Sequence, residues 1–198
     1  MTPWRSLLLA LGLAGGLAAC DDDRQAAVAP PPQEPGPEAI GHYCGMTVAD
    51  HPGPKGQVFL EGASEPLWFS SVRDVLAFTL LPEESKAVAA IYVNDMGLVE
   101  DWERPEPETW VAAQDAVYVV GSDLRGGMGA QETVPFSDRA AAERFRDRHG
   151  GEIFAFGAVP EDYVLGPGEG PPLQAPRDPA EQLSDERTQG GQDGHGAH

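Results

Sequence analysis

The sequence predicts an α+β fold made of two related small strand-helix-strand units. An internal repeat carries this prediction, because Phe69–Phe78 matches Phe136–Phe145 at an offset of 67 residues, with Phe-Ser opening both copies and Phe closing both. Segments rich in β-branched and aromatic residues lie before and after each copy, as expected of strands. The 126 residues from 41 to 166 are enough for one compact domain or two very small ones.

Each copy of the repeat predicts one helix. A Ser near the start of each copy can act as the N-cap, because its side-chain oxygen can accept a hydrogen bond from a free backbone N–H of the first turn. The residues that follow are good helix formers, with apolar positions three and four apart. We therefore expect an amphipathic helix in each unit.

Four segments carry the strand signal, one before and one after each predicted helix. They are Val58–Leu60, Ala90–Val93, Ala116–Val120 and Glu152–Phe156. We also expect an extra strand in each unit.

The first nineteen residues predict a lipoprotein signal peptide. Arg5 is followed by an apolar run from Leu7 to Ala19, which is too short to span a bilayer comfortably and has the layout of a secretory signal. The run ends in Leu17–Cys20, which resembles a bacterial lipobox, so Cys20 is expected to become the lipidated first residue of the mature chain. Several acyl chains on one residue would anchor it stably. The acidic residues beginning at Asp21 resemble a signal that favours the inner membrane.

Composition divides the rest of the chain. Residues 20–40 are expected to be the lipidated Cys and a Pro-rich extended tether, because they contain five prolines from position 30 onward and no apolar periodicity. The first α+β unit is expected at 41–104 and the second at 105–166. The polar stretch at 167–198 cannot bury enough apolar surface to order itself and is expected to be a disordered acidic tail.

The chain is strongly acidic, with a formal net charge of -19 at pH 7. Such a charge disfavours nucleic acid and anionic lipid head groups as partners. It favours solubility, cations and a basic docking face on a partner protein.

Cys44 is the residue that most requires a chemical explanation. With Cys20 acylated it is the last thiol in the chain, and in an oxidising compartment it must be buried, paired between chains or ligated. Met46 places a thioether two residues away, and Gly45 between them has no side chain to keep the two sulfurs apart. Two soft donors favour Cu(I) over Mg²⁺ and Ca²⁺, and more weakly over Zn²⁺, which would want four regularly spaced ligands.

Three residues are candidates for a third ligand. Met128 stands among three glycines at 126, 127 and 129, where an ordinary core position is not expected, although it could also cover an apolar patch beside the loop. Met96 follows a predicted strand and is a similar, weaker candidate. His42 could supply an imidazole or could be an exposed loop residue.

The run from His42 to Leu165 resembles the NosL family, the accessory lipoproteins of nitrous-oxide reductase maturation. The residues that carry the resemblance are the lipobox, Tyr43–Met46, Trp68–Ser70, Ile91–Asp95, Gly121–Ser122 and Gly126–Gly129. The resemblance implies two small units similar to the organomercurial lyase (MerB-like) domain. It also implies Cu(I) bound by Cys44 and Met46, with Met128 at the glycine-flanked methionine of the family.

The same resemblance implies a biological setting. The expected partners are nitrous-oxide reductase, an ABC-type membrane transporter and the periplasmic accessory protein that works with it. The expected location is the periplasmic face of a bacterial membrane. The pair His195 and His198 lies outside the resemblance, and either a second weak metal site or no role at all is compatible with it.

Three functions stay open from the sequence. A copper chaperone works by ligand exchange rather than catalysis, so no enzymatic activity is expected. A thiol-dependent lyase would use Cys44 as its nucleophile, but lyase chemistry of the organomercurial type is expected to need two thiols and an acid. A docking lipoprotein of the same maturation machinery would not need Cys44 at all.

Overall fold

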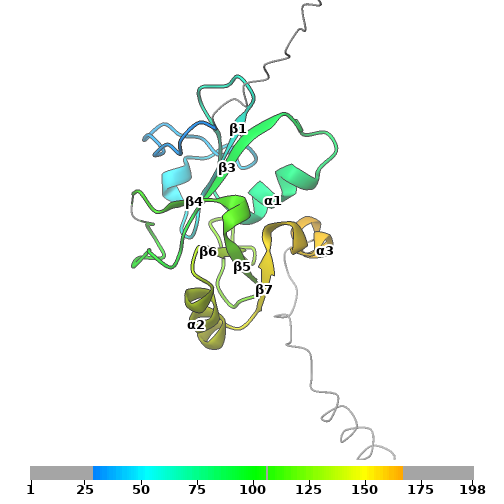
Figure 1. Ribbon diagram of the computed structural model, residues 1–198. Coiled ribbons are helices and arrows are strands. Elements are labelled where there is room, and N and C mark those ends of the chain that lie inside the picture. Colours follow the sequence, from blue (N-terminus) through cyan, green and yellow to red (C-terminus); the bar gives the residue numbers. More distant parts are fainter. Residues whose placement is uncertain (1–28, 106, 167–198) are drawn as a thin grey trace, which may run out of the picture.

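A computed structural model describes residues 29–105 and 107–166, and these form the α+β fold expected from the sequence. The first part contains β1 (Gly56–Leu60), β2 (Leu67–Phe69), α1 (Val72–Leu80), β3 (Val88–Asn94) and β4 (Trp110–Ala112). The second contains β5 (Val117–Val120), β6 (Val134–Phe136), α2 (Arg139–His149), β7 (Glu152–Ala155) and α3 (Glu161–Leu165). Short 3-10 turns lie at Val48–Asp50, Ala113–Asp115 and Phe156–Ala158. Figure 1 shows the first sheet above the second, with α1 beside the first and α2 below the second.

Three strands of the first sheet have the same arrangement as the three strands of the second, and β4 is added at one edge of the first. The strand orders of the two sheets are β2-β1-β3-β4 and β6-β5-β7, and every neighbouring pair is antiparallel. In each unit the first strand lies between the second and third, and the helix connects the second strand to the third. The expected repeat is therefore confirmed, and β2 and β6 are the extra strands. The likeness to the organomercurial lyase domain stays a prediction.

The two helices of the repeat, α1 and α2, begin with different caps. Ser71 caps α1 as expected, since its side chain accepts a hydrogen bond from Arg73 N. The expected Ser cap of α2 is wrong, because Asp138 takes that position and its carboxylate accepts from two backbone N–H groups of the first turn. Ser137 instead donates its hydroxyl to a carboxylate oxygen of Asp95. A carboxylate at the N-terminus of a helix also interacts favourably with the helix dipole.

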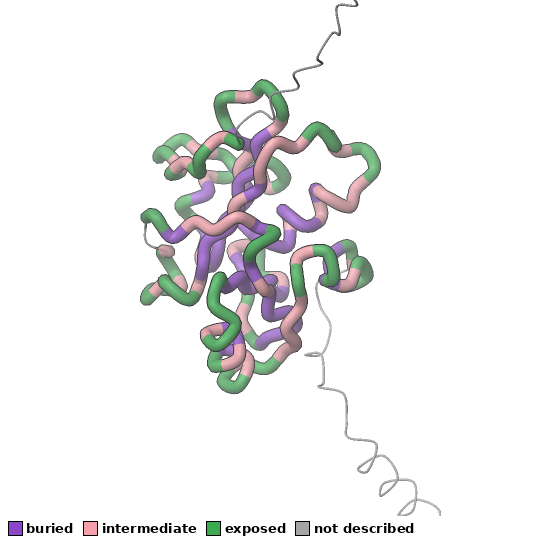
Figure 2. Tube along the Cα trace, viewed as in Figure 1, coloured by how far each residue is buried: buried purple, intermediate pink, exposed green. Residues whose placement is uncertain are grey.

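The two units share one hydrophobic core although each has its own sheet. The main core combines Val75 and Phe78 of α1 with Tyr118 of β5 and Val164 of α3, all buried. A smaller core lies between β6 and α2, where Phe136 and Phe145 are in contact. Figure 2 shows these buried stretches running from the first sheet into the second. β4 follows the expected unit boundary at 104 in the chain, yet it pairs with β3 of the first sheet.

The N-terminal segment from residue 30 onward lies against the first sheet. Gln33 and the fully buried Gln57 form a reciprocal pair of hydrogen bonds, each of 2.9 Å, between backbone and side-chain amide. Glu34 accepts a 2.9 Å hydrogen bond from the indole N–H of Trp110. Part of the expected tether is therefore held on the fold.

Several expectations fall outside the described residues. The signal peptide, Cys20 and the acidic tail with His195 and His198 lie in 1–28 and 167–198. Among the helices that are described, none is long and apolar enough to cross a membrane.

Candidate metal centre

The Cys-Gly-Met motif lies on a closed turn beside β2. Gly41 N donates a 2.9 Å hydrogen bond to the carbonyl of Met46, and Gly45 N donates one of the same length back to Gly41 O. His42 N donates to Trp68 O at 2.7 Å, which joins the turn to the strand. Gly45 has a φ of 66°, a conformation that glycine adopts without steric cost. The turn therefore holds Cys44 and Met46 at a fixed place at the edge of the first sheet.

The sulfur of Cys44 is in contact with a buried hydroxyl. Cys44 Sγ lies 3.2 Å from Ser70 Oγ, and Ser70 is 1% exposed. A Cβ at position 41 would lie 2.5 Å from this sulfur and 2.8 Å from this hydroxyl oxygen. The contact therefore depends on glycine at that position. Cys44 itself is a partly exposed free cysteine.

The two best methionine candidates are exposed, whereas the third is not. Met46 is 42% exposed and Met128 is 52% exposed. Met96 packs against the smaller core and is partly buried, so this structure gives it a packing role. Thioethers on the surface are accessible to an incoming ion, and Met46 and Met128 meet this requirement.

The loop that carries Met128 is a tight turn. Gly126 N donates to Ala130 O and Gly129 N donates to Gly126 O, both at 2.9 Å. Gly127 packs on His51, whose Nδ1 lies 3.1 Å from the Gly127 carbonyl oxygen. A side chain on Gly127 would place its Cβ 2.3 Å from that of His51. The glycines thus allow a close approach that presents Met128 outward.

A buried glutamate joins this loop to the Cys44 region. Glu132 accepts hydrogen bonds from Ser71 Oγ at 3.1 Å and from Arg73 N at 3.2 Å. Its other carboxylate oxygen would lie 2.1 Å from a Cβ at Gly126 and has no hydrogen-bond partner within the part of the chain that is described. Ser71 directly follows Ser70, the residue in contact with Cys44. Glu132 therefore links the base of the Met128 loop to the start of α1, next to the residue that contacts Cys44.

Sequence reasoning missed both polar residues of this region. Glu132 stands between Gln131 and Thr133, a polar sequence typical of an exposed loop, and nothing in it indicates full burial. Ser70 lies in a segment that predicts a helix start, and its partner Cys44 is 26 residues away. The signal that could have singled out Ser70 is the repeat, because Phe-Ser opens both of its copies.

Burial raises the pKa of Glu132 to about 7, from an ordinary value of 4.5. Between these two pH values Glu132 is protonated in the folded protein and ionised in the unfolded chain. The free energy of unfolding therefore falls as the pH rises from about 4.5 to about 7. We expect Glu132→Gln to remove this dependence, so that the variant gains about 3 kcal/mol over wild type between pH 4.5 and pH 8. Urea unfolding of both proteins across that range measures the difference.

The control for this measurement is Glu61→Gln, which changes an exposed carboxylate after β1. Its unfolding free energy should follow that of wild type at every pH. If Glu132→Gln also follows wild type, Glu132 is ionised in the folded protein at neutral pH and the interpretation is wrong.

His42 pairs with a carboxylate in this structure. Its Nε2 lies 3.6 Å from Glu84 Oε1, which also accepts a 2.8 Å hydrogen bond from the Tyr43 hydroxyl. The imidazole packs against the rings of Phe69 and Phe78. Burial and the hydrogen bond to Glu84 raise the pKa of Tyr43 above its ordinary value. His42 therefore supports the turn through Glu84 and the aromatic core.

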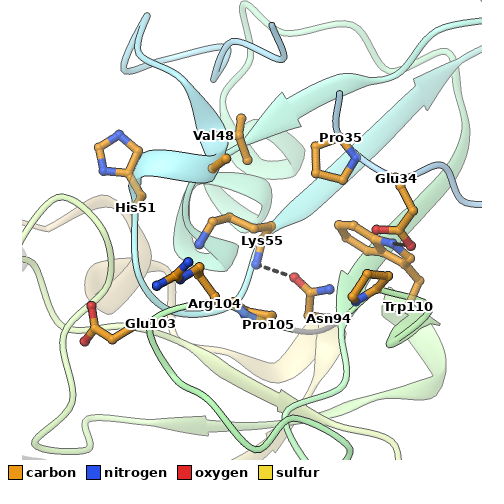
Figure 3. Close-up of a pocket in the computed structure, with 12 residues that line it drawn as sticks. Glu34, Pro35, Val48, His51, Lys55, Asn94, Glu103, Arg104, Pro105 and Trp110 are labelled. Carbon is orange, nitrogen blue, oxygen red and sulfur yellow. Dashed lines mark hydrogen bonds between the residues drawn. The ribbon is translucent and has the colours of Figure 1, made fainter. Parts of the chain in front are cut away.

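A cavity of about 380 Å³ lies under the N-terminal segment, and Figure 3 shows the residues that line it. Its lining includes Pro35, Val48, Lys55 and Trp110, but neither Cys44 nor any of the candidate methionines. Burial lowers the pKa of Lys55 to about 8. The cavity is therefore separate from the sulfur-bearing turn.

Comparisons with known proteins show which family the chain resembles. A family model described as NosL matches residues 32–164, a range that includes Cys44, Met46 and Met128. The chain is 46% identical over 169 residues to the copper-binding lipoprotein NosL of Achromobacter cycloclastes, covering 85% of this chain and 86% of that protein. It is 35% identical over 149 residues to the protein of the same name from Stutzerimonas stutzeri, covering 75% and 76%.

A solved structure is also similar. The crystal structure of the copper chaperone NosL from Shewanella denitrificans superimposes with a TM-score of 0.62 at 34% identity. The superposition covers 66% of this chain and 98% of that one.

Proposed function

We propose that this chain, which belongs to the NosL family, is a lipid-anchored extracytoplasmic protein that binds Cu(I) and hands it to another protein. One observation carries the proposal: the Cys44 thiol and the exposed Met46 thioether are held on one closed turn. Thiolate and thioether donors select Cu(I). The names of the relatives, copper-binding lipoprotein and copper chaperone, support the same conclusion.

The donor set proposed for Cu(I) is Cys44, Met46 and Met128. Cys44 supplies the negative charge that holds the cation, and the two thioethers complete a low-coordinate site. Both methionines are exposed, so one face of the bound ion stays open to a ligand from another protein. The ion can then pass between proteins through a shared intermediate without being released to solvent.

The biological role is a proposal that rests on the resemblance to the family. The copper is proposed to serve assembly of the metal centres of nitrous-oxide reductase. An ABC-type transporter and its periplasmic accessory protein are the other proposed partners. The anchor is proposed to be Cys20, on the periplasmic face, with Asp21 favouring the inner membrane.

A docking lipoprotein of the same machinery is the second candidate. Exposed apolar side chains beside the turn favour it, because Ile40 is 51% exposed and Tyr43 is 39% exposed. A partner could bind this surface without any copper being transferred. A thiol-dependent lyase is less favoured, because Cys44 is the one free cysteine among the described residues.

Anaerobic titration with Cu(I) against a competing chelator tests the main proposal. The mature chain, kept soluble by Cys20→Ser, should bind about one Cu(I), because it offers one thiolate. Zn(II) should compete poorly, since a tetrahedral zinc site needs four nitrogen, sulfur or carboxylate ligands. Equal retention of Cu(I) and Zn(II) would contradict a soft-donor site.

A further inference from the structure

The hydroxyl of Ser70 contacts a sulfur and takes no part in capping α1. The cap of α1 is Ser71, whose hydroxyl oxygen accepts from Arg73 N. The Ser70 hydroxyl instead lies 3.2 Å from Cys44 Sγ. Ser70 is almost completely buried, so water has little access to the contact from its side.

Ser70 lies at the junction between a strand and a helix. It follows Phe69, the last residue of β2, and precedes the N-cap of α1, so a strand and a helix fix it from both sides. The backbone of Gly41 lies close to both the Cys44 sulfur and the Ser70 hydroxyl. A residue with a side chain could not take this place, because its Cβ would overlap both atoms. The Cys44 sulfur therefore has Ser70 Oγ as its near polar neighbour on the buried side, and its other polar contact is a longer, 3.9 Å hydrogen bond to the Met46 carbonyl oxygen.

We propose that Ser70 is a positioning residue of the copper site, whose hydroxyl donates a hydrogen bond to the Cys44 thiolate and orients its sulfur toward the metal. This proposal rests on the proposed function. A thiolate has no proton, so the hydroxyl must be the donor in the metal-binding form. Cys44 is itself partly exposed, so its sulfur stays accessible to an ion on the side away from Ser70.

The same hydrogen bond affects the bound ion. A donor to sulfur lowers the energy of the sulfur lone pairs, so the ultraviolet thiolate-to-copper absorption lies at a shorter wavelength than it would without the bond. Outer-shell partners of this kind typically change metal affinity by about 10–100-fold when they are removed. Loss of this hydrogen bond is therefore expected to weaken Cu(I) binding and to shift the absorption band to longer wavelength.

The experiment compares Ser70→Ala with wild type in the anaerobic Cu(I) titration. Ser70→Ala should still bind one Cu(I), about 10–100-fold more weakly, with the absorption band shifted to longer wavelength. Ser122→Ala is the matched control, because its buried hydroxyl has no partner within the described part of the chain. It should leave both the affinity and the band unchanged.

A second pair of variants breaks the same contact from the other side. Gly41→Ala inserts a Cβ between Cys44 and Ser70 and should reproduce the weaker binding and the shifted band. Gly36→Ala, at a glycine with nothing within 4 Å of the added Cβ, should behave as wild type. Thermal unfolding of each apoprotein identifies any variant that loses its fold.

The outcomes separate the two proposals. If Cys44→Ser abolishes binding while Ser70→Ala keeps wild-type affinity and spectrum, the positioning role is wrong and the copper site stands. If Cys44→Ser binds Cu(I) as wild type does, both proposals are wrong. A shift of affinity without a shift of the band would also overturn the hydrogen bond to sulfur, because general loosening of the turn would then suffice.

Discussion

Cys44→Ser is expected to remove more Cu(I) affinity than any other single substitution in this chain. The thiolate supplies the only negative charge among the three proposed donors, whereas Met46 and Met128 are neutral. The loss should exceed about 100-fold, since removal of an outer-shell partner alone costs about 10–100-fold. Anaerobic competition with a Cu(I) chelator measures it.

The methionine variants give the order within the site. Met46→Leu and Met128→Leu keep the size and apolar character of each side chain but remove its donor, so each should weaken binding by a smaller factor than Cys44→Ser. Met96→Leu is the matched control, because Met96 packs against the smaller core. A larger loss at Met96 than at Met128 would move the third ligand to position 96.

The parts of the fold that the sequence predicted are those with a local signal. Both α1 and α2 have a side-chain cap and an apolar stripe, and the repeat places these two helices in equivalent positions. β2 and β6 were expected only as unplaced extra strands, because three residues are too few to show alternation. β6 also contains Pro135, which is tolerated because β6 is an edge strand.

The pairing of β4 with β3 could not be predicted, because it depends on contacts distant in the sequence. β4 has only three residues, Trp110–Ala112, and joins the first sheet after a long connection. The N-terminal segment was expected to be a free tether from its prolines. Its docking depends on Gln57, a buried polar residue whose partner, Gln33, is 24 residues away.

The candidate site could likewise be predicted from the sequence only in part. Cys44 and Met46 are close in sequence, so the chemistry of the motif could be recognised without a structure. The burial of Ser70 and Glu132 results from tertiary packing, and their contacts join residues 26 and 61 positions apart. Sequence therefore indicates which donors are present, whereas the fold determines what surrounds them.

In cells, Cys44→Ser is expected to leave nitrous-oxide reductase folded and exported but short of copper and poorly active. The reason is that the variant removes the charged donor of the proposed delivery site, while no feature of this chain indicates a role in folding the reductase. Copper content per purified reductase, measured beside its activity in cells grown under copper limitation, tests this. Excess copper should partly restore both quantities, as mass action replaces delivery.

The control strain carries Met96→Leu, which changes a packing methionine and should leave the reductase fully loaded. Equal amounts of each lipoprotein in the membrane fraction must accompany the comparison, because a lost protein would imitate a lost site. The docking hypothesis makes the opposite prediction, since a surface formed by Ile40 and Tyr43 is intact in the Cys44→Ser protein. Normal copper content and activity in that strain under copper limitation would therefore favour docking over delivery, and Tyr43→Ala would then be the variant expected to leave the reductase without copper.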